Sequence, residues 1–290
     1  MSDKIYEEHL TQITQLLSQP RTSFLIGAGC SHCAGLPMMD ELTNNIFEDI
    51  EQKAKSNNEK KALNLLKDVR ESFNTNQKVT IEDLLSEIQD IDSILTRRSN
   101  KGVKNPTYLI NKTKYLLEDT QCLLKLIKNS IRDRLGSSIK TIKYHRIFCR
   151  AIHGQLVQGK ERAKQPVNYF VLNYDTLIED ALSLESVTFN DGFVGGSTAW
   201  WDPNRFTGEE YTLGGDRKLD ARVFTLHGSI DWIRTADSVY PIRIRNTLPV
   251  EEILDNGEPV VIYPSAFKYK EAQHDPFAQM ITSFRKYITD

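Results

Sequence analysis

The stretch SFLIGAGCSHCAGLP, from Ser23 to Pro37, decides how this sequence is interpreted. Phe24, Leu25 and Ile26 form the centre of a short apolar segment that is typical of a buried strand. Small residues follow at once, with glycines at positions 27, 29 and 35. Glycines directly after a strand allow a tight turn in which backbone N–H groups approach an anion. The stretch therefore predicts a phosphate-binding loop, and a purely structural turn is the alternative.

Two cysteines in the same stretch, Cys30 and Cys33, have the C-x-x-C spacing of a redox pair or of half a zinc site. A redox pair does not need three flanking glycines. A zinc site needs further ligands; His32 can supply one, but Cys122 and Cys149 are isolated in helical segments. The phosphate loop accounts for more of the residues than either alternative, and no zinc is expected.

The glycine spacing differs from that of the common dinucleotide fingerprint. The third glycine, Gly35, comes six residues after Gly29 rather than three. A Gly-Lys-Ser/Thr sequence is also absent. These two features disfavour an NAD-linked dehydrogenase and a P-loop ATPase.

Three later segments repeat the design of an apolar strand that ends in small or polar residues. They are PVNYFVLNYD (Pro166–Asp175), RVFTLHGS (Arg222–Ser229) and PVVIYPS (Pro259–Ser265). Together with the first segment they predict four parallel strands whose carboxyl ends gather the functional groups. The expected fold class is α/β, a Rossmann-like parallel sheet flanked by helices. Hairpins are expected between the second and third of these strands and again after His227.

The sequence between the first two strands is long, charged and helical, so we expect a large helical insertion after the first strand. One apolar stripe contains Leu84, Ile88, Ile91 and Leu95, with Thr80 and Asp83 as an N-terminal cap pair. Two further stripes are Leu116, Leu123, Leu126, Ile127 and Ile131, and then Tyr144, Ile147, Phe148 and Ala151. The expected domains are residues 1–40 with 155–290 for the Rossmann-like part, and residues 41–154 for the insertion.

Composition narrows the class of protein. The 290 residues carry a net charge of −2 and are 39% hydrophobic, an ordinary balance for a globular protein without a global basic field. No run approaches the roughly 18 apolar residues of a membrane span, and the N-terminus has no signal core. Four unevenly spaced cysteines do not make a disulfide framework. We expect a reduced, cytoplasmic protein that does not enter a membrane.

Three motifs, in this order, resemble those of the sirtuin (silent information regulator) family. GAGCSHCAGLP resembles the loop that opens the sirtuin catalytic domain, LNYD (Leu172–Asp175) resembles its Q-N-[IY]-D strand end, and LHGS (Leu226–Ser229) resembles the strand end with the catalytic histidine. The zinc module of the deacylases, two C-x-x-C pairs after the histidine, is missing, as is the Asp-Phe-Arg that follows the proline. The combination resembles the sirtuin-like NAD hydrolases of prokaryotic antiphage defence.

The resemblance implies a hydrolase that cleaves NAD+ to nicotinamide and ADP-ribose and depletes NAD during infection. It also implies a homo-oligomer, with a HerA-type ATPase or an Argonaute as partner. Asn173 and His227 would be catalytic, Asn173 orienting water or ribose hydroxyls and His227 acting as general base. NAD would be bound by Gly27, Ala28, Gly29, Ser31, Gly35, Pro37, Asp175, Gly228 and Ser229.

Several alternatives stay open. Asn173 and Asp175 are also suited to capping the next helix, and His227 to an ordinary buried turn. Two other functions also stay open: an NAD or ADP-ribose sensor without catalysis, and a nucleic-acid-processing subunit with basic groups such as Arg243 and Arg245. The strand expected to hold adenosine is not found, so the 290 residues are either part of a longer protein or a chain with an incomplete fold.

Overall fold

The computed structural model describes residues 2–17, 22–137, 139–155, 165–206, 219–234, 238, 240–245, 258–266 and 268–289. The chain divides into two compact units. The first comprises Met1–Gly35, Ile139–Val261 and Ala272–Asp290, and the second comprises Leu36–Ser138 and Ile262–Glu271. Within the part of the chain described, no helix is both long enough and apolar enough to cross a bilayer.

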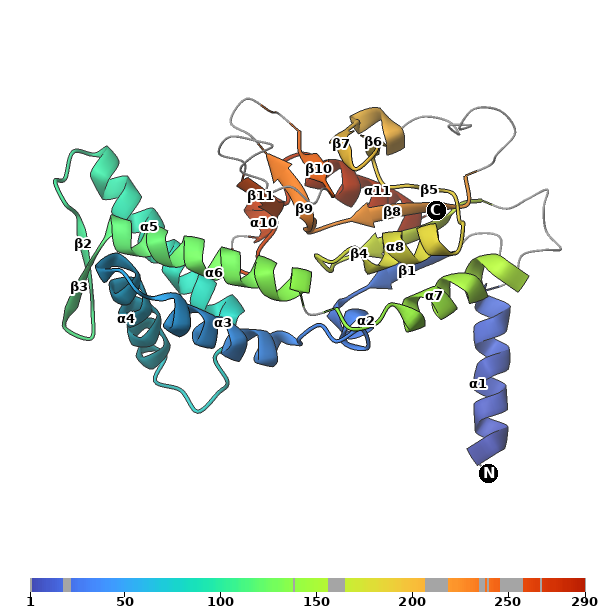
Figure 1. Ribbon diagram of the computed structural model, residues 1–290, viewed down its shortest axis with the longest axis horizontal. Helices are drawn as coiled ribbons and strands as arrows, with labels where there is room; N and C mark the ends of the chain where they lie inside the picture. The colour runs from blue at the N-terminus through green and yellow to red at the C-terminus, as the bar shows by residue number, and fades with distance from the viewer. Residues whose placement is uncertain are drawn as a thin grey trace. The chain divides into compact units, whose positions relative to one another are not determined.

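A four-stranded parallel sheet lies at the centre of the first unit (Figure 1). Its strands follow the order β1 (Ser23–Ile26), β4 (Val167–Val171), β8 (Ala221–Thr225) and β5 (Phe189–Asn190). The register pairs Ile26 with Val171 and Val171 with Thr225, so the three longer strands end at the same level. The predicted fold class is confirmed: a Rossmann-like α/β sheet flanked by helices, with a helical region after the first strand.

Strand β4 is buried along its whole length because both faces of the sheet are covered. On one face Tyr169 packs in a cluster with residues of α7 (Lys143–Arg150) and α8 (Leu177–Leu184). On the other face the ring of Phe170 lies 4.8 Å from that of Phe224 and 4.8 Å from that of Phe284 in α11 (Phe277–Thr289). Two covered faces explain why the segment does not alternate apolar and polar residues, with Asn168 as its one strongly polar residue.

One of the four strands predicted to be parallel lies in a different sheet. The segment PVVIYPS contributes β11 (Glu258–Val261), which pairs antiparallel with β9 (Gly228–Arg234). Their five-stranded sheet continues with β10 (Ile242–Ile244), β7 (Thr198–Trp201) and β6 (Phe193–Gly195). The prediction was wrong because a short apolar run indicates burial but not strand direction. The fourth parallel strand is β5, whose two residues are too few to make a pattern.

The predicted hairpins are confirmed as the antiparallel pairs β6 with β7 and β9 with β10. Between β7 and β8 lies a short 3₁₀ helix, Pro203–Phe206. Trp201 and Trp232 are buried in this sheet, with ring centroids 5.8 Å apart, whereas Trp200 is exposed.

Helix α7 turns a different face to the core than predicted. Tyr144 and Ile147, expected on the apolar stripe, are exposed, whereas His145 and Cys149 are buried. The helix ends at Arg150 and continues as a π-helical segment, Ala151–Gln155. The prediction failed because the stripe was assigned from apolar residues alone, whereas His145 and Cys149 occupy the buried face.

Helices dominate the second unit. They are α3 (Met39–Lys53), α4 (Asn57–Ser72), α5 (Ile81–Asn100), α6 (Leu117–Ser137) and the short α10 (Lys268–Glu271). The predicted stripe of α5 is confirmed, since Leu84, Ile88, Ile91 and Leu95 are all buried. Thr80 and Asp83 form the expected capping box. Leu116 belongs not to α6 but to a hairpin of β2 (Thr107–Ile110) and β3 (Thr113–Leu116), which the sequence analysis missed.

Two helices at the N-terminus complete the first unit. Helix α1 (Ser2–Leu17) leaves Leu10 and Ile13 exposed. The short α2 (Ala28–His32) begins directly after β1. In the sheet order, β1 is an edge strand, with Leu25 60% exposed.

Gly228 gives a direct test of this architecture. Its φ is +78°, and a Cβ there would lie 2.2 Å from the backbone oxygen of Val260 in β11. We expect Gly228→Ala to lower the free energy of unfolding by about 2 kcal/mol or more, because it combines left-handed strain with a backbone clash. Urea unfolding measures the loss.

Gly136→Ala is the matched control, since nothing lies within 4 Å of a Cβ at that position. It is expected to leave stability unchanged or raise it slightly. Equal effects of the two substitutions would contradict the packing of β9 against β11.

Candidate functional site

The carboxyl ends of the three longer parallel strands are joined by backbone hydrogen bonds that continue beyond the strands. The Leu172 N–H donates to Ile26 O at 2.8 Å, and the Leu226 N–H donates to Val171 O at 2.8 Å. The Ile230 N–H donates to Tyr174 O at 2.9 Å. The three motif segments of the sequence analysis therefore meet at one edge of the sheet.

Asn173 connects the end of β4 to the glycine loop. Its side chain is 8% exposed, and its Nδ2 donates to Gly27 O at 3.1 Å and to Ser31 Oγ at 2.5 Å. The amide oxygen Oδ1 accepts no hydrogen bond from the described residues. The amide donors of Asn173 thus hold the glycine loop. In a helix cap, by contrast, the side-chain oxygen would accept a hydrogen bond from a backbone N–H of the helix.

Ser31 and Asp175 extend this chain of hydrogen bonds. The Ser31 hydroxyl, buried at 3% exposure, donates to Asp175 Oδ2 at 2.7 Å. The other oxygen of Asp175 accepts from the Leu177 N–H at 3.1 Å, so Asp175 also supports the first turn of α8. Burial raises the pKa of the Asp175 carboxyl, and the hydrogen bond from Ser31 opposes that rise. One carboxylate serves both the loop and the helix.

His227 lies at the end of β8, half buried. Its Nδ1 is 3.1 Å from Leu172 O. Since a carbonyl oxygen only accepts, Nδ1 carries the proton in this contact, and Nε2 carries the lone pair of the neutral ring. The His227 ring centroid lies 6.3 Å from that of Tyr174. The backbone of the Asn173 strand end thus fixes the tautomer of His227.

Gly27 and Gly29 border open space. Nothing lies within 4 Å of a Cβ built at either position, and the φ of Gly27 is −122°, which other residues adopt readily. Neither packing nor backbone strain therefore requires glycine here. The neighbouring Ala28 is exposed, as is Gly29. A side chain at 27 or 29 would project into this open space beside the loop.

The other predicted binding residues have backbone or packing roles. Gly35, with φ of +99°, ends the turn after α2, and its N–H donates to His32 O at 3.0 Å. Gly228 packs against β11, and the buried Ser229 donates from its hydroxyl to Tyr174 O at 3.1 Å. Pro37 is buried in the second unit, ahead of α3.

A cysteine–histidine contact beside the loop was missed by the sequence analysis. Cys30 Sγ lies 3.6 Å from Nε2 of His145, which is 3% exposed. Burial lowers the pKa of His145, and the nearby Asp175 carboxyl opposes this. No sequence signal could have linked His145 to Cys30, because 115 residues separate them.

The cysteines of the C-x-x-C pair are both free thiols. Burial raises the pKa of Cys30, which disfavours the reactive thiolate. Cys33 is exposed, and its Sγ donates to Cys30 O at 3.0 Å. Over the described ranges, no three His, Cys, Asp or Glu side chains gather as metal ligands.

Comparison of the sequence with models of known protein families gives no match, and comparison with curated proteins gives none either.

Glu179 of α8 is a buried carboxyl close to the end of β8. It is 3% exposed, its Oε1 lies 3.5 Å from Thr225 Oγ1, and its Oε2 has no hydrogen-bond partner among the residues that the structure describes. Burial raises its pKa to about 8, and the charge of Arg245 opposes the rise. Between pH 4.5 and about 8 the Glu179 carboxyl therefore stays protonated in the folded protein, whereas in the unfolded chain, with its ordinary pKa of 4.5, it is ionised.

Because the folded state binds this proton more tightly than the unfolded chain, the free energy of unfolding falls as pH rises from about 4.5 to about 8. Above that pH both states are ionised and the contribution stays constant. Glu179→Gln removes the titration. We expect the melting temperature of the variant relative to the wild type to increase across that range, by a few degrees at its upper end. The exposed Glu118→Gln is the control and should show no such trend. A difference for Glu179→Gln that is constant with pH would refute the assignment.

Proposed function

We propose that the chain is a sirtuin-like NAD+ hydrolase that cleaves NAD+ to nicotinamide and ADP-ribose. The observation that carries the proposal is the hydrogen-bonded convergence of the three motif segments, in which Asn173 binds both Gly27 O and Ser31 Oγ. Segments far apart in the sequence, each resembling a part of the sirtuin NAD site, meet at one sheet edge. A ligand at this edge agrees with the general rule for open α/β sheets.

The glycine loop would hold the pyrophosphate. Gly27 and Gly29 leave open space beside their backbone, and Gly29 is exposed. Phosphate oxygens can approach backbone N–H groups closely where no Cβ intervenes. Ser31 and Asp175 would hold the loop in place without contacting the ligand, since their side chains are buried and hydrogen-bonded to each other.

The chemical step would use Asn173 and His227. Nicotinamide leaves as a neutral base with the electron pair of its bond to ribose C1′, and water forms the new bond to C1′. Asn173 Oδ1 would accept a hydrogen bond from that water or from a ribose hydroxyl. Nε2 of His227 would take the proton that the water loses. The overall products are nicotinamide, ADP-ribose and one proton.

The biological role follows from the same resemblance. We propose a cytoplasmic effector that depletes NAD in antiphage defence, acting as a homo-oligomer with a HerA-type ATPase or an Argonaute as partner. An enzyme of this kind must stay silent until it is triggered, because loss of NAD kills the cell. Assays should therefore include DNA and any candidate partner.

Nicotinamide release from NAD+ by the full chain is the primary test. We expect His227→Ala to reduce the rate by about 10²–10⁴-fold, the usual contribution of a general base. Asn173→Ala should reduce it at least as much, because it removes both an acceptor and the loop contact. His274→Ala, an exposed histidine of the first unit, is the control. Full activity in His227→Ala would overturn the assigned role.

Gly29→Ala separates ligand binding from folding. The structure offers room for the methyl group, and alanine suits the helical conformation of α2 better than glycine. We expect an unchanged or slightly raised melting temperature, with NAD+ affinity weakened by about tenfold or more because the methyl group occupies the ligand space. Calorimetric titration with NAD+ or ADP-ribose measures this. Unchanged affinity would show that the ligand does not approach the loop.

A binding module without catalysis is the second candidate. The observation that favours it is the commitment of the Asn173 amide donors to the loop, a structural use of the residue. Tight ADP-ribose binding with no nicotinamide release, under every activating condition tried, would support this candidate over hydrolysis. Salt-sensitive DNA binding by the chain alone would instead support a nucleic-acid-processing role.

A further inference from the structure

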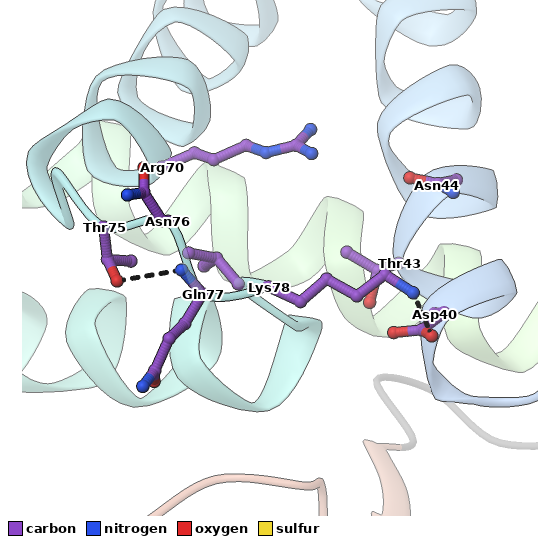
Figure 2. Close-up of a pocket in the computed structure, with 9 residues that line it drawn as sticks. Asp40, Thr43, Asn44, Arg70, Thr75, Asn76, Gln77 and Lys78 are labelled. Atoms are coloured by element: carbon purple, nitrogen blue, oxygen red, sulfur yellow. Dashed lines mark hydrogen bonds and ion pairs between the residues drawn. The ribbon is translucent and has the colours of Figure 1, made fainter.

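A polar pocket of about 600 Å³ lies in the second unit. Its walls come from the start of α3, the last turns of α4 and the loop that joins α4 to α5 (Figure 2). The lining residues are Asp40, Thr43, Asn44, Arg70, Thr75, Asn76, Gln77, Lys78 and Val79. The volume is within the range of small-molecule sites. All but one of these residues have side chains with hydrogen-bonding atoms.

The pocket has an excess of positive charge. Lys78 reaches from the loop to form an ion pair with Asp40, the one acidic residue of the lining. Arg70 extends from α4 across the opening toward α3 (Figure 2). Its guanidinium lies 4.7 Å from the Phe47 ring centroid, and no carboxylate of the described chain pairs with it. One planar cation is therefore held by an aromatic ring and open to an anion.

Hydrogen bonds connect the elements that line the pocket. The Thr43 hydroxyl, buried at 3% exposure, donates to Met39 O at 2.7 Å and accepts from the Ile81 N–H at 2.9 Å. This ties α3 to the start of α5. In the loop, the Gln77 N–H donates to Thr75 Oγ1 at 3.0 Å. The start of α3 is thus joined to α5, and the loop carries one hydrogen bond of its own.

We infer that this pocket binds a small phosphate-bearing molecule of nucleotide size. Guanidinium matches the oxygens of a phosphate through two parallel hydrogen bonds, and Lys78 adds a point charge nearby. The amides of Asn44 and Asn76 both donate and accept, which suits the hydroxyls and ring edges of a nucleoside. The site lies wholly within the second unit, so this inference does not depend on the proposed NAD hydrolysis.

The test is calorimetric titration of the full chain with adenosine 5′-monophosphate, inorganic phosphate and adenosine. It is made in the Gly29→Ala background, in which binding at the strand-end loop is expected to be weakened. We expect adenosine monophosphate to bind, and adenosine to bind at least about tenfold more weakly because it lacks the charged hydrogen bonds. Adenosine binding equally well, or no binding of the monophosphate at millimolar concentration, would overturn the inference.

Two substitutions shift the affinity in opposite directions. Arg70→Gln keeps a polar side chain but removes the guanidinium and its charge, and should weaken binding about tenfold or more. Asp40→Asn removes the competing carboxylate and releases Lys78, and should strengthen binding by about two- to fivefold. Arg97→Gln, an exposed arginine of α5 outside the pocket, is the control and should change nothing.

The fold of each variant is checked by its melting curve. If Arg70→Gln lowers the melting temperature, Arg70→Lys keeps the charge and is expected to bind with intermediate affinity, since lysine lacks the planar fork. An affinity unaffected by Arg70→Gln, or one lost in Arg97→Gln as well, would refute the site.

Discussion

The hydrogen bonds of the Asn173 amide hold the glycine loop against the end of β4. They form only because the register of β1 and β4 brings Ile26 and Val171 to the same level, so that the residues after each strand face one another. The Ser31 hydroxyl in turn donates a hydrogen bond to Asp175, which precedes α8. Three elements distant in sequence are fixed by one buried amide, one hydroxyl and one carboxylate, and the proposed chemistry depends on that arrangement.

The residues of the three motifs divide by their physical role. Gly228 and Ser229 are needed by the packing of β9, and Gly35 by the turn after α2. Gly27 and Gly29, in contrast, meet no neighbour that would require a glycine. A motif that resembles a family's binding loop thus contains some residues that shape the backbone and others that leave room beside it. Burial and contact distances separate the two groups where residue type cannot.

Much of the fold could be predicted from the sequence. The strands β1, β4 and β8, the stripe of α5 and the capping box of Thr80 and Asp83 all follow from local pattern, although β1 lies at the sheet edge with Leu25 exposed and is not the buried strand expected. The direction of β11 and the two-residue β5 could not be predicted, because strand pairing is decided by tertiary contacts. At the candidate site the motif residues were found, but the contact of Cys30 with His145 was not, since it spans 115 residues without a periodic signal.

The four thiols of the chain differ in solvent accessibility, which determines where a thiol reagent will label the protein. Cys149 is buried, and burial raises its pKa to about 12, while Cys30 and Cys122 are partly buried and burial raises the pKa of each. Cys33 is exposed, and it follows directly after α2. A maleimide dye would thus react fastest at this position, next to the glycine loop. The native chain thereby carries a built-in attachment point for a fluorescent reporter of loop occupancy.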